Sequence, residues 1–466
     1  MNKPKPNILL LFTDQQRWDA LACAGGWMRT PHIDQIASEG TLFTQCVTNS
    51  PVCVPARISL ATGWYPHNTG VWRNGNVTLP KETPTWVRAL RDAGYRTSLF
   101  GKAHLHSLLD HTDLRRKEHL LRAYGFDDVN EVPGPRGAAR IACHMTSEWK
   151  ERGLWDAYRR DMRARLASKL PVARPSPLDL DSYYDVYVGR KAADYLHDYK
   201  NSKPWFCWVG FPGPHEPWDA PEPYASMYDP SEAPEPISYS EECWDRAEKR
   251  PRGWLDRRLH ERGGHVSSSL GKQLRASYAG NVTLIDDQVG KLIDVVRRRG
   301  ELDRTVIVFA SDHGEMNGDF GMVGKSNMLD PAVRVPLVIR VPGTRSGGTT
   351  INCLVELMDL GPTLVELAGG ELRHQQFGRS LVPILEDPSL QHRVEAVVEL
   401  RREVMLYTMS WKMTANARGD PYLLFNRTED PEERANLAGT YEGQKIEKEM
   451  MARLRRRIDE TQVNEY

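Results

Sequence analysis

The sequence predicts an α/β fold in which a large, mostly parallel sheet lies between layers of helices, followed by a smaller C-terminal α+β domain with an antiparallel sheet. Three observations support this prediction: short apolar runs of strand length recur along the chain, amphipathic helical patterns lie between them, and the pattern changes after about residue 385. Strands that alternate with helices indicate a parallel sheet covered on both faces. The 466 residues, 40% of them hydrophobic, suffice for one large core and a smaller domain.

The predicted strands of the large sheet are continuous apolar runs. Residues 7–12 (NILLLF), 205–211 (WFCWVGF) and 305–310 (TVIVFA) contain no charged side chain, as expected of parallel strands buried on both faces. Residues 335–341 predict another strand of this kind, although Pro336 weakens it, and residues 97–100 form a short apolar strand.

Two helices are predicted from periodicity. Between 279 and 299 the apolar residues fall on one helical face, and Gly300 ends the helix; residues 85–93 form a shorter helix closed by Gly94. The main domain is expected to cover residues 1–385. Two polar segments, about 110–177 and 212–271, are expected to be long insertions that wall a binding site.

The C-terminal subdomain is expected to span residues 386–466. Residues 395–400, 404–415 and 421–425 predict antiparallel strands, and residues 441–458 predict a closing helix.

Composition excludes several classes of function. The 62 Lys and Arg residues balance 62 Asp and Glu residues, which argues against a nucleic-acid partner. There is no apolar stretch of membrane-spanning length and no signal-peptide core, so we expect no membrane partner and a cytoplasmic location. The seven cysteines are odd in number and irregularly spaced, which favours neither a disulfide framework nor a CxxC metal site.

The segment Cys53-Val54-Pro55-Ala56-Arg57 carries the strongest chemical signal. Pro55 shapes a turn, and the residues after Arg57, Ile58 to Gly63, read as the start of a helix. A helix N-terminus beside an arginine makes a site for an anion. Cys53 is therefore positioned for nucleophilic chemistry on an anionic ester.

Acidic residues and a histidine follow two of the predicted strands. Asp14 comes after the first strand, and Asp312 and His313 come after the strand at 305–310. Ligands bind at the carboxyl ends of strands in open α/β sheets, and carboxylates gathered there need a cation. Asp14 alone could be an ordinary helix N-cap. Together with the Cys53 segment, three separate segments indicate one metal-dependent site.

These motifs resemble those of the sulfatases of the alkaline-phosphatase superfamily, over nearly the whole chain. The resemblance implies an alkaline-phosphatase-like sandwich, with a catalytic domain over residues 1–385. The matching segments are 7–14, 30–34, 53–63, 101–105, 214–215, 311–315, 324–325, 423–431 and 436–438.

The resemblance implies a modified nucleophile. Cys53 would be oxidised to formylglycine by a maturation enzyme, and one hydroxyl of the aldehyde hydrate would attack sulfur to give a covalent sulfate ester. Removing a proton from the other hydroxyl would expel sulfate and restore the aldehyde. Asp14, Asp312 and His313, with residue 53 as a further ligand, would hold one divalent metal.

The resemblance also implies the roles of the surrounding cations and histidines. Arg57 would stabilise the attacking hydroxyl, and Lys102 and Lys325 would bind sulfate oxygens. His104 would take the proton of the second hydroxyl, and His215 with Lys325 would protonate the departing alcohol. Taken singly, Lys102, His104 and His215 would pass for surface or loop residues.

Two positions depart from the common sulfatase pattern. Gln15 stands where many sulfatases have a second aspartate, and His313 stands where many have asparagine. Calcium is the favoured metal, and the imidazole ligand makes manganese the alternative. Gln15 is a metal-ligand or substrate-binding candidate. Asn74, in the loop after the Cys53 helix, either binds substrate or shapes a turn.

The leading hypothesis is a sulfatase that hydrolyses the sulfate monoester of a small molecule or glycan. The Asp-Gln and Asp-His pairs also resemble choline sulfatases and phosphonate monoester hydrolases, so a phosphonate or phosphate mono- or diester hydrolase is the alternative. The pair Lys102 and His104 favours a sulfatase. A third reading is a non-catalytic binder of sulfated glycans. Homo-oligomerisation stays open.

The tryptophans of the two insertions either stack on a substrate or pack in the protein interior: Trp149, Trp155, Trp218, Trp244 and Trp254.

Overall fold

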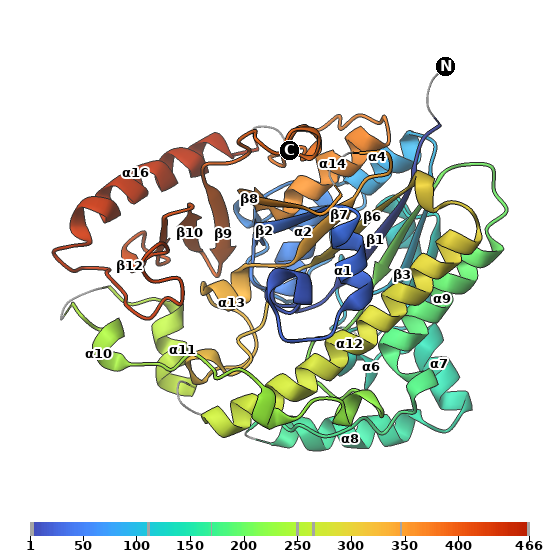
Figure 1. Ribbon diagram of the computed structural model, residues 1–466, viewed down its shortest axis with the longest axis horizontal. Coiled ribbons are helices and arrows are strands. Elements are labelled where there is room, and N and C mark those ends of the chain that lie inside the picture. The colour runs from blue at the N-terminus through green and yellow to red at the C-terminus, as the bar shows by residue number, and fades with distance from the viewer. Residues whose placement is uncertain are drawn as a thin grey trace.

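The computed structural model describes residues 4–109, 112–168, 170–247, 251–262, 266–344 and 347–463. Its main sheet has eight strands in the order β4-β3-β5-β1-β6-β7-β2-β8. Six of them, β1, β2, β3, β6, β7 and β8, are labelled in Figure 1. The strands are β1 (Asn7–Thr13), β2 (Thr41–Val47), β3 (Arg96–Gly101), β4 (Asp128–Glu131), β5 (Trp205–Gly210), β6 (Thr305–Ser311), β7 (Leu337–Arg340) and β8 (Thr349–Glu356).

Helices cover both faces of this sheet. One layer contains α1 (Pro31–Ser38), α9 (Tyr184–Asp198) and α12 (Ser268–Arg298), and the other contains α2 (Cys53–Thr62), α4 (Trp86–Asp92) and α14 (Leu360–Leu367). Alternate residues of β1 enter the two cores: Leu9 and Leu11 pack with the first layer, and Ile8 and Leu10 with the second. The predicted sandwich with a mostly parallel sheet is confirmed.

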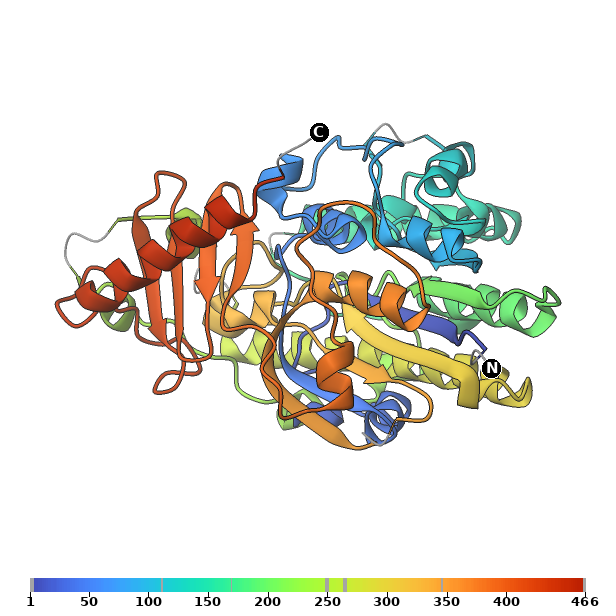
Figure 2. The same cartoon turned by 90° about the horizontal axis from the view of Figure 1, so that it is seen from above.

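The C-terminal sheet is antiparallel, as predicted, with the order β12-β11-β10-β9. Its strands are β9 (Ala396–Leu400), β10 (Glu403–Tyr407), β11 (Trp411–Ala415) and β12 (Pro421–Asn426). Helix α16 (Gln444–Glu460) lies along this sheet at one end of the molecule (Figure 2). Met450 and Leu454 of α16 pack against Leu406 and Leu424 of the sheet.

Three details of the predicted strands were wrong. Strand β7 is antiparallel to both of its neighbours, β6 and β2. The connection from β6 to β7 contains only the short helical pieces η7 (Asp319–Gly321) and α13 (Asp330–Val333). It does not cross to the other end of the strands, so β7 starts beside the end of β6 and runs in the opposite direction. The segment 404–415 is two strands, because Thr408 and Trp411 close a hairpin turn through a 2.8 Å backbone bond. The short edge strand β4 was not predicted.

Helix α12 begins at Ser268, earlier than predicted, and Ser267 caps it by accepting the Leu270 amide hydrogen. The segment 110–177 contains η2 (Leu114–Lys117), α5 (Glu118–Ala123), β4, α6 (Pro135–Ala138), α7 (His144–Glu151) and α8 (Trp155–Ala167). The segment 212–271 contains η4 (Tyr224–Ser226), η5 (Pro230–Glu232), α10 (Glu241–Trp244), α11 (Trp254–Arg262) and the start of α12.

The remaining helical pieces connect these elements. They are η1 (Ala22–Ala24), α3 (Pro66–Thr69), η3 (Leu180–Ser182), η6 (Leu302–Arg304), η8 (Leu357–Asp359) and α15 (Val382–Glu386). Trp149, Trp218 and Trp244 are buried and serve packing, whereas Trp155 and Trp254 are partly exposed. No disulfide joins any of the seven cysteines, all of which the structure describes. No helix in the described part of the chain is long and apolar enough to cross a membrane.

Candidate active site

Four neighbouring parallel strands, β3, β5, β1 and β6, deliver the polar residues of the site to one edge of the main sheet. Lys102 directly follows β3, Asp14 follows β1, and Asp312 follows β6, while His215 lies in the loop after β5. The close approach of β3 and β5 depends on glycine. Gly101 has a φ of +106°, and an added Cβ would lie 2.0 Å from the carbonyl oxygen of Gly210. The neighbouring Lys102 amide donates to that same oxygen at 2.8 Å.

Cys53 is the first residue of α2. Pro55 lies in the first turn of the helix, where a missing amide hydrogen costs nothing because these groups have no partner within the helix. The Oδ1 atom of Asn74 accepts the Val54 amide hydrogen at 2.9 Å, so Asn74 satisfies one group at this helix end. Gly63, with a φ of +72°, ends the helix.

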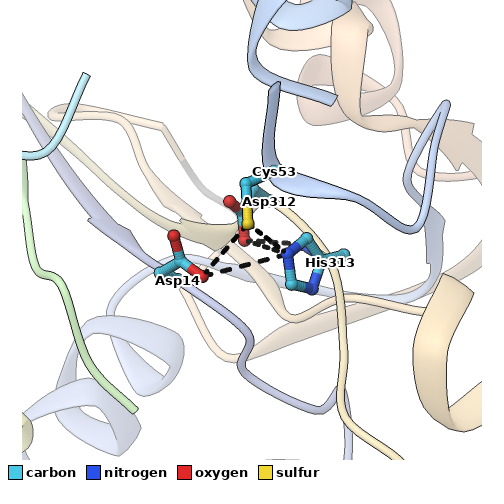
Figure 3. Close-up of side chains that lie close together, drawn as sticks. All are labelled: Asp14, Cys53, Asp312 and His313. Atoms are coloured by element: carbon cyan, nitrogen blue, oxygen red, sulfur yellow. Dashed lines mark hydrogen bonds and ion pairs between the residues drawn. The ribbon is translucent and has the colours of Figure 1, made fainter. Parts of the chain in front are cut away.

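The side chains of Asp14, Cys53, Asp312 and His313 converge at this edge (Figure 3). All four are buried, and one ligand atom from each lies within 4.8 Å of the others. The His313 Nε2 atom lies 3.1 Å from the Cys53 sulfur, 3.6 Å from Asp312 Oδ1 and 3.8 Å from Asp14 Oδ1. Because His313 Nδ1 lies 3.0 Å from the Gly314 carbonyl oxygen, Nδ1 donates a hydrogen there, and Nε2 is the ring nitrogen that faces the cluster. This donor set fits a divalent cation.

Arg57 holds the carboxylates of Asp14 and Asp312 in place through hydrogen bonds. Its Nε donates to Asp312 Oδ2 at 2.8 Å and one terminal nitrogen donates to Asp14 Oδ2 at 3.2 Å, while the other terminal nitrogen donates to the Lys102 carbonyl at 2.8 Å. The Lys102 ammonium also donates to Asp14 Oδ2. Burial and Cys53 act to raise the pKa of Asp14, but Lys102, His215 and Arg57 hold it well below its usual value. Because Arg57 binds the Oδ2 atoms of Asp14 and Asp312, their Oδ1 atoms are left directed toward the cluster.

The electrostatic field at position 53 favours an anion. Burial acts to raise the pKa of the Cys53 thiol, but Lys102, Lys325 and His313 hold it well below its usual value. His104 lies beside Cys53 and helps to lower the pKa of the thiol. Burial and the charge of Lys102 lower the pKa of His104, so its imidazole is neutral at neutral pH. A neutral base therefore lies beside an anion-stabilising position.

Two protein-family models match long segments of the chain. The model of the family described as "Sulfatase" matches residues 6–370, and the model described as "N-sulphoglucosamine sulphohydrolase, C-terminal" matches residues 318–460. The chain belongs to the sulfatase family.

Individual relatives span nearly the whole of this sulfatase. It is 27% identical to the ulvan-active sulfatase of Formosa agariphila, over 98% of this chain and 81% of the relative. It is 28% identical to the choline-sulfatase of Rhizobium meliloti, over 94% of this chain and 83% of the relative. The crystal structure of the phosphonate monoester hydrolase of Agrobacterium radiobacter superposes with a TM-score of 0.82 at 26% identity, covering 97% of this chain and 96% of that one.

Gln15 joins the sulfatase site to two carboxylates that sequence reasoning missed. Its Nε2 donates to Glu216 at 2.7 Å and also to Glu315, while its Oε1 accepts from the Lys325 ammonium. Gln15 has a φ of +71°, a conformation that costs energy in residues other than glycine. Glu216 directly follows His215, and Glu315 ends the motif at 311–315, but nothing in the sequence indicated that they meet at Gln15.

The charges around Lys325 keep it protonated. Burial acts to lower the pKa of Lys325, but Cys53 and Glu216 raise it to about 12. Burial acts to raise the pKa of Glu216, but His215 and Lys325 lower it to about 2. Burial and the charge of Glu216 raise the pKa of Glu315. Lys325 is thus a fixed positive charge at this end of the site.

The structure brings the predicted residues together. Direct contacts link six of them, and His104 lies beside Cys53: the six are Asp14, Cys53, Arg57, Lys102, Asp312 and His313. His215 is nearly buried, and its Nδ1 lies 2.9 Å from the Glu216 carbonyl oxygen. Asn74 is exposed and lies at the start of α2. The catalytic, metal-binding and substrate-binding roles of these residues stay predictions.

Proposed function

We propose that this sulfatase hydrolyses a sulfate monoester to an alcohol and inorganic sulfate, using formylglycine made from Cys53 as nucleophile and one divalent metal. One observation carries the proposal: Cys53 lies in a buried cluster with Asp14, Asp312 and His313, with ligand atoms within 4.8 Å. A hydrate hydroxyl at position 53 would lie among these donors and beside His104.

Asp14, Asp312 and His313 would hold the metal, together with residue 53. When bound, the metal supplies a Lewis acid that lowers the pKa of the nucleophilic hydroxyl and polarises the sulfate group. Carboxylate oxygens favour calcium, and the His313 imidazole makes manganese the alternative.

The remaining side chains have roles that follow from their contacts. Arg57 fixes Asp14 and Asp312 and adds positive charge beside the nucleophile. Lys102 and Lys325 bind sulfate oxygens. Neutral His104 takes a proton from the hydroxyl at position 53 that does not attack sulfur. His215, with Lys325, donates a proton to the departing alcohol oxygen.

Peptide mass spectrometry across residue 53 tests the nucleophile. Protein made in a host with the formylglycine-generating enzyme is expected to have lost the Cys53 sulfur and gained an aldehyde, which a hydrazine probe labels. The Cys53→Ala variant serves as the unlabelled control and is expected to be inactive. An unmodified thiol in active protein would rule out the proposed nucleophile.

A phosphonate or phosphate ester hydrolase is the second candidate, favoured by the similarity to the phosphonate monoester hydrolase over 97% of this chain. Sulfate and phosphonate monoesters are both tetrahedral oxyanions that the same cations can bind. Rates on p-nitrophenyl sulfate and on a phenyl phosphonate ester separate the two, and faster phosphonate turnover would favour the second candidate. An unmodified Cys53 with no turnover of either would indicate a non-catalytic binder.

The names of relatives support the class of substrate. An ulvan-active sulfatase and a choline-sulfatase are among them, so we propose a sulfated glycan or a sulfated small molecule for this chain as well.

A further inference from the structure

A cationic cavity of about 430 Å³ lies between the loop at residues 70–77 and the turn that joins β9 to β10. Three arginines line it: Arg73 from the loop, and Arg401 and Arg402 from the turn. All three are exposed to solvent. The Arg401 amide donates to the Trp72 carbonyl oxygen at 3.3 Å, so the turn and the loop are joined.

Within the described part of the chain, no carboxylate forms an ion pair with the three arginines of this cavity. Among the residues lining it there is no carboxylate, and within the described part of the chain no Asp or Glu oxygen pairs with the guanidinium groups of Arg73, Arg401 or Arg402 within 4.0 Å. The neighbouring Glu403 is occupied elsewhere, because its oxygens accept from the Trp254 amide and the Tyr422 hydroxyl, both at 2.6 Å.

Like charges crowd Arg401. Its guanidinium carbon lies 4.1 Å from the Trp254 ring centroid, and the guanidinium of Arg257 lies 5.3 Å from the same centroid. Burial and the charges of Arg73 and Arg257 lower the pKa of Arg401 and outweigh the opposing charge of Glu403. An anion that enters the cavity would relieve this repulsion.

Both walls of the cavity are tied to the segments that carry the site. In the loop wall, Asn74 accepts the Val54 amide hydrogen, one residue after Cys53. Trp254, which contacts Arg401, donates its indole hydrogen to the Ser326 carbonyl oxygen at 2.9 Å, one residue after Lys325. The Ser326 amide in turn donates to the Pro51 carbonyl at 3.0 Å. The loop wall thus contacts the segment that carries Cys53, and Trp254 beside the other wall contacts the segment that carries Lys325.

We propose that this cavity binds a second oxyanion of the substrate, a carboxylate or a sulfate distant from the ester that is cleaved. The proposal rests on the proposed function and narrows its substrate to a sulfated saccharide with at least two anionic groups. Arginine favours this role because its planar fork pairs with carboxylate or sulfate oxygens through two hydrogen bonds. The cavity volume lies in the range that holds a sugar-sized group.

Steady-state kinetics test the proposal with three substrates: p-nitrophenyl sulfate, a disulfated disaccharide, and a monosulfated disaccharide that contains a uronic acid. The variants Arg401→Gln, Arg402→Gln and Arg73→Gln are expected to raise KM for the disaccharides about tenfold more than for the aryl sulfate, with kcat little changed. The disulfated and the uronic acid substrates distinguish sulfate from carboxylate as the second anion.

Arg418→Gln is the matched control, because Arg418 is exposed in another hairpin turn of the same sheet and does not line the cavity. It is expected to behave as wild type with all three substrates. Equal effects of the Arg401 and Arg402 substitutions on the aryl sulfate and the disaccharides would overturn the proposal, as would no effect on either.

A binding measurement separates this proposal from the proposed function. Calorimetric titration of the same two disaccharides into Cys53→Ala protein needs no turnover. Binding is expected to weaken about tenfold in Cys53→Ala/Arg401→Gln but not in Cys53→Ala/Arg418→Gln. If wild-type protein turns over no sulfate ester while this difference in binding holds, the proposed function fails and the anion site stands. If wild-type protein turns over a sulfate ester but the two double variants bind the disaccharides equally well, the anion site is ruled out and the proposed function stands.

Discussion

The environment of Cys53 differs from that of an ordinary nucleophilic thiolate. Its side chain is buried, and the sulfur lies 3.7 Å from Asp14 Oδ1, which repels a thiolate, and 3.1 Å from the His313 imidazole. Cations outweigh this repulsion, since Lys102 and Lys325 help to lower the thiol pKa. The same cations would favour ionisation of a hydroxyl in this place. The field of the site thus suits an oxygen nucleophile on a metal as well as it suits sulfur.

Arg57→Lys is expected to lower kcat/KM by roughly 10²- to 10³-fold. Arg57 bonds Asp14, Asp312 and the Lys102 carbonyl at once, and a single ammonium cannot reproduce that fork, so one carboxylate would lose its brace and turn away from the cluster. Steady-state assay with the best sulfate ester measures the loss. Arg159→Lys, at an exposed position on α8, is the control. Activity of Arg57→Lys within twofold of wild type would contradict the bracing role.

The lowered pKa of His104 predicts the pH dependence of turnover. A base acts only when it is unprotonated, so activity is lost as pH falls through its pKa. Burial and Lys102 lower that pKa from the ordinary value of 6.5, and the acid limb of kcat is therefore expected below pH 6.5. The pH profile of kcat measures the limb. His104→Gln is expected to lower kcat and to remove this limb, and an unchanged limb in that variant would assign it to another group.

At the scale of elements, the sequence predicted the strands that position the site. The apolar runs of β1 and β6 were recognisable because both faces of these strands are covered, and Asp14 and Asp312 follow them directly. Strand β4 escaped prediction because its residues Asp128–Glu131 are mostly polar at the edge of the sheet. The hairpin turn at Thr408–Trp411 contains neither glycine nor proline, so no residue signalled it.

The junction between α14 and the C-terminal sheet depends on a buried ion pair. Asp359, the last residue of η8, accepts from the Arg379 amide at 2.7 Å and from Arg393 Nε at 2.9 Å, and lies 3.0 Å from His392 Nε2. Arg393 is also nearly fully buried. Burial acts to raise the pKa of Asp359, but Arg393 and His392 hold it well below its usual value. Both partners therefore stay charged in the folded protein.

Asp359→Asn is expected to lower the free energy of unfolding by about 3–5 kcal/mol at neutral pH, because it leaves the buried Arg393 without its closest counter-charge. Because the folded pKa of Asp359 is depressed, the wild-type pair contributes stability above the ordinary pKa of 3.8 and loses it as pH falls below that value. The variant is expected to lose less stability than wild type over the same acid range. Urea denaturation at several pH values measures both effects.

Asp387→Asn is the control for this pair, since Asp387 is exposed and its side chain bonds only the nearby Ser389 among the described residues. A difference of less than about 1 kcal/mol between Asp359→Asn and this control would show that the ion pair contributes as little as a surface pair.

At the scale of the whole molecule, a formal net charge of zero conceals local gatherings of cations. Residues far apart in sequence form the site and the cationic cavity, and their meeting depends on the tertiary fold. Family motifs marked Lys102 and Lys325, but Arg401 and Arg402 belong to no motif, and Glu216 and Glu315 became partners of Gln15 only through folding. Sequence could therefore predict the residues that meet at the candidate site more fully than those that line the cationic cavity.

The balance of buried charge leads to a prediction on metal removal. Arg57 and Lys102 already neutralise Asp14 and Asp312, and ionised Glu216 offsets Lys325. A bound divalent ion therefore leaves the centre with two positive charges. A sulfate monoester and an ionised nucleophile bring one negative charge each, which restores neutrality in a site where unbalanced charge is costly.

Chelation is therefore expected to abolish turnover and to lower the thermal midpoint, because a ligand at 1,000 times its Kd stabilises by about 4 kcal/mol. Activity assays and thermal melts of dialysed protein, with calcium or manganese added back, measure both effects. Asp312→Asn is the matched variant, expected to be insensitive to chelator, and wild-type protein that keeps its activity and melting temperature after chelation would contradict a metal at this centre.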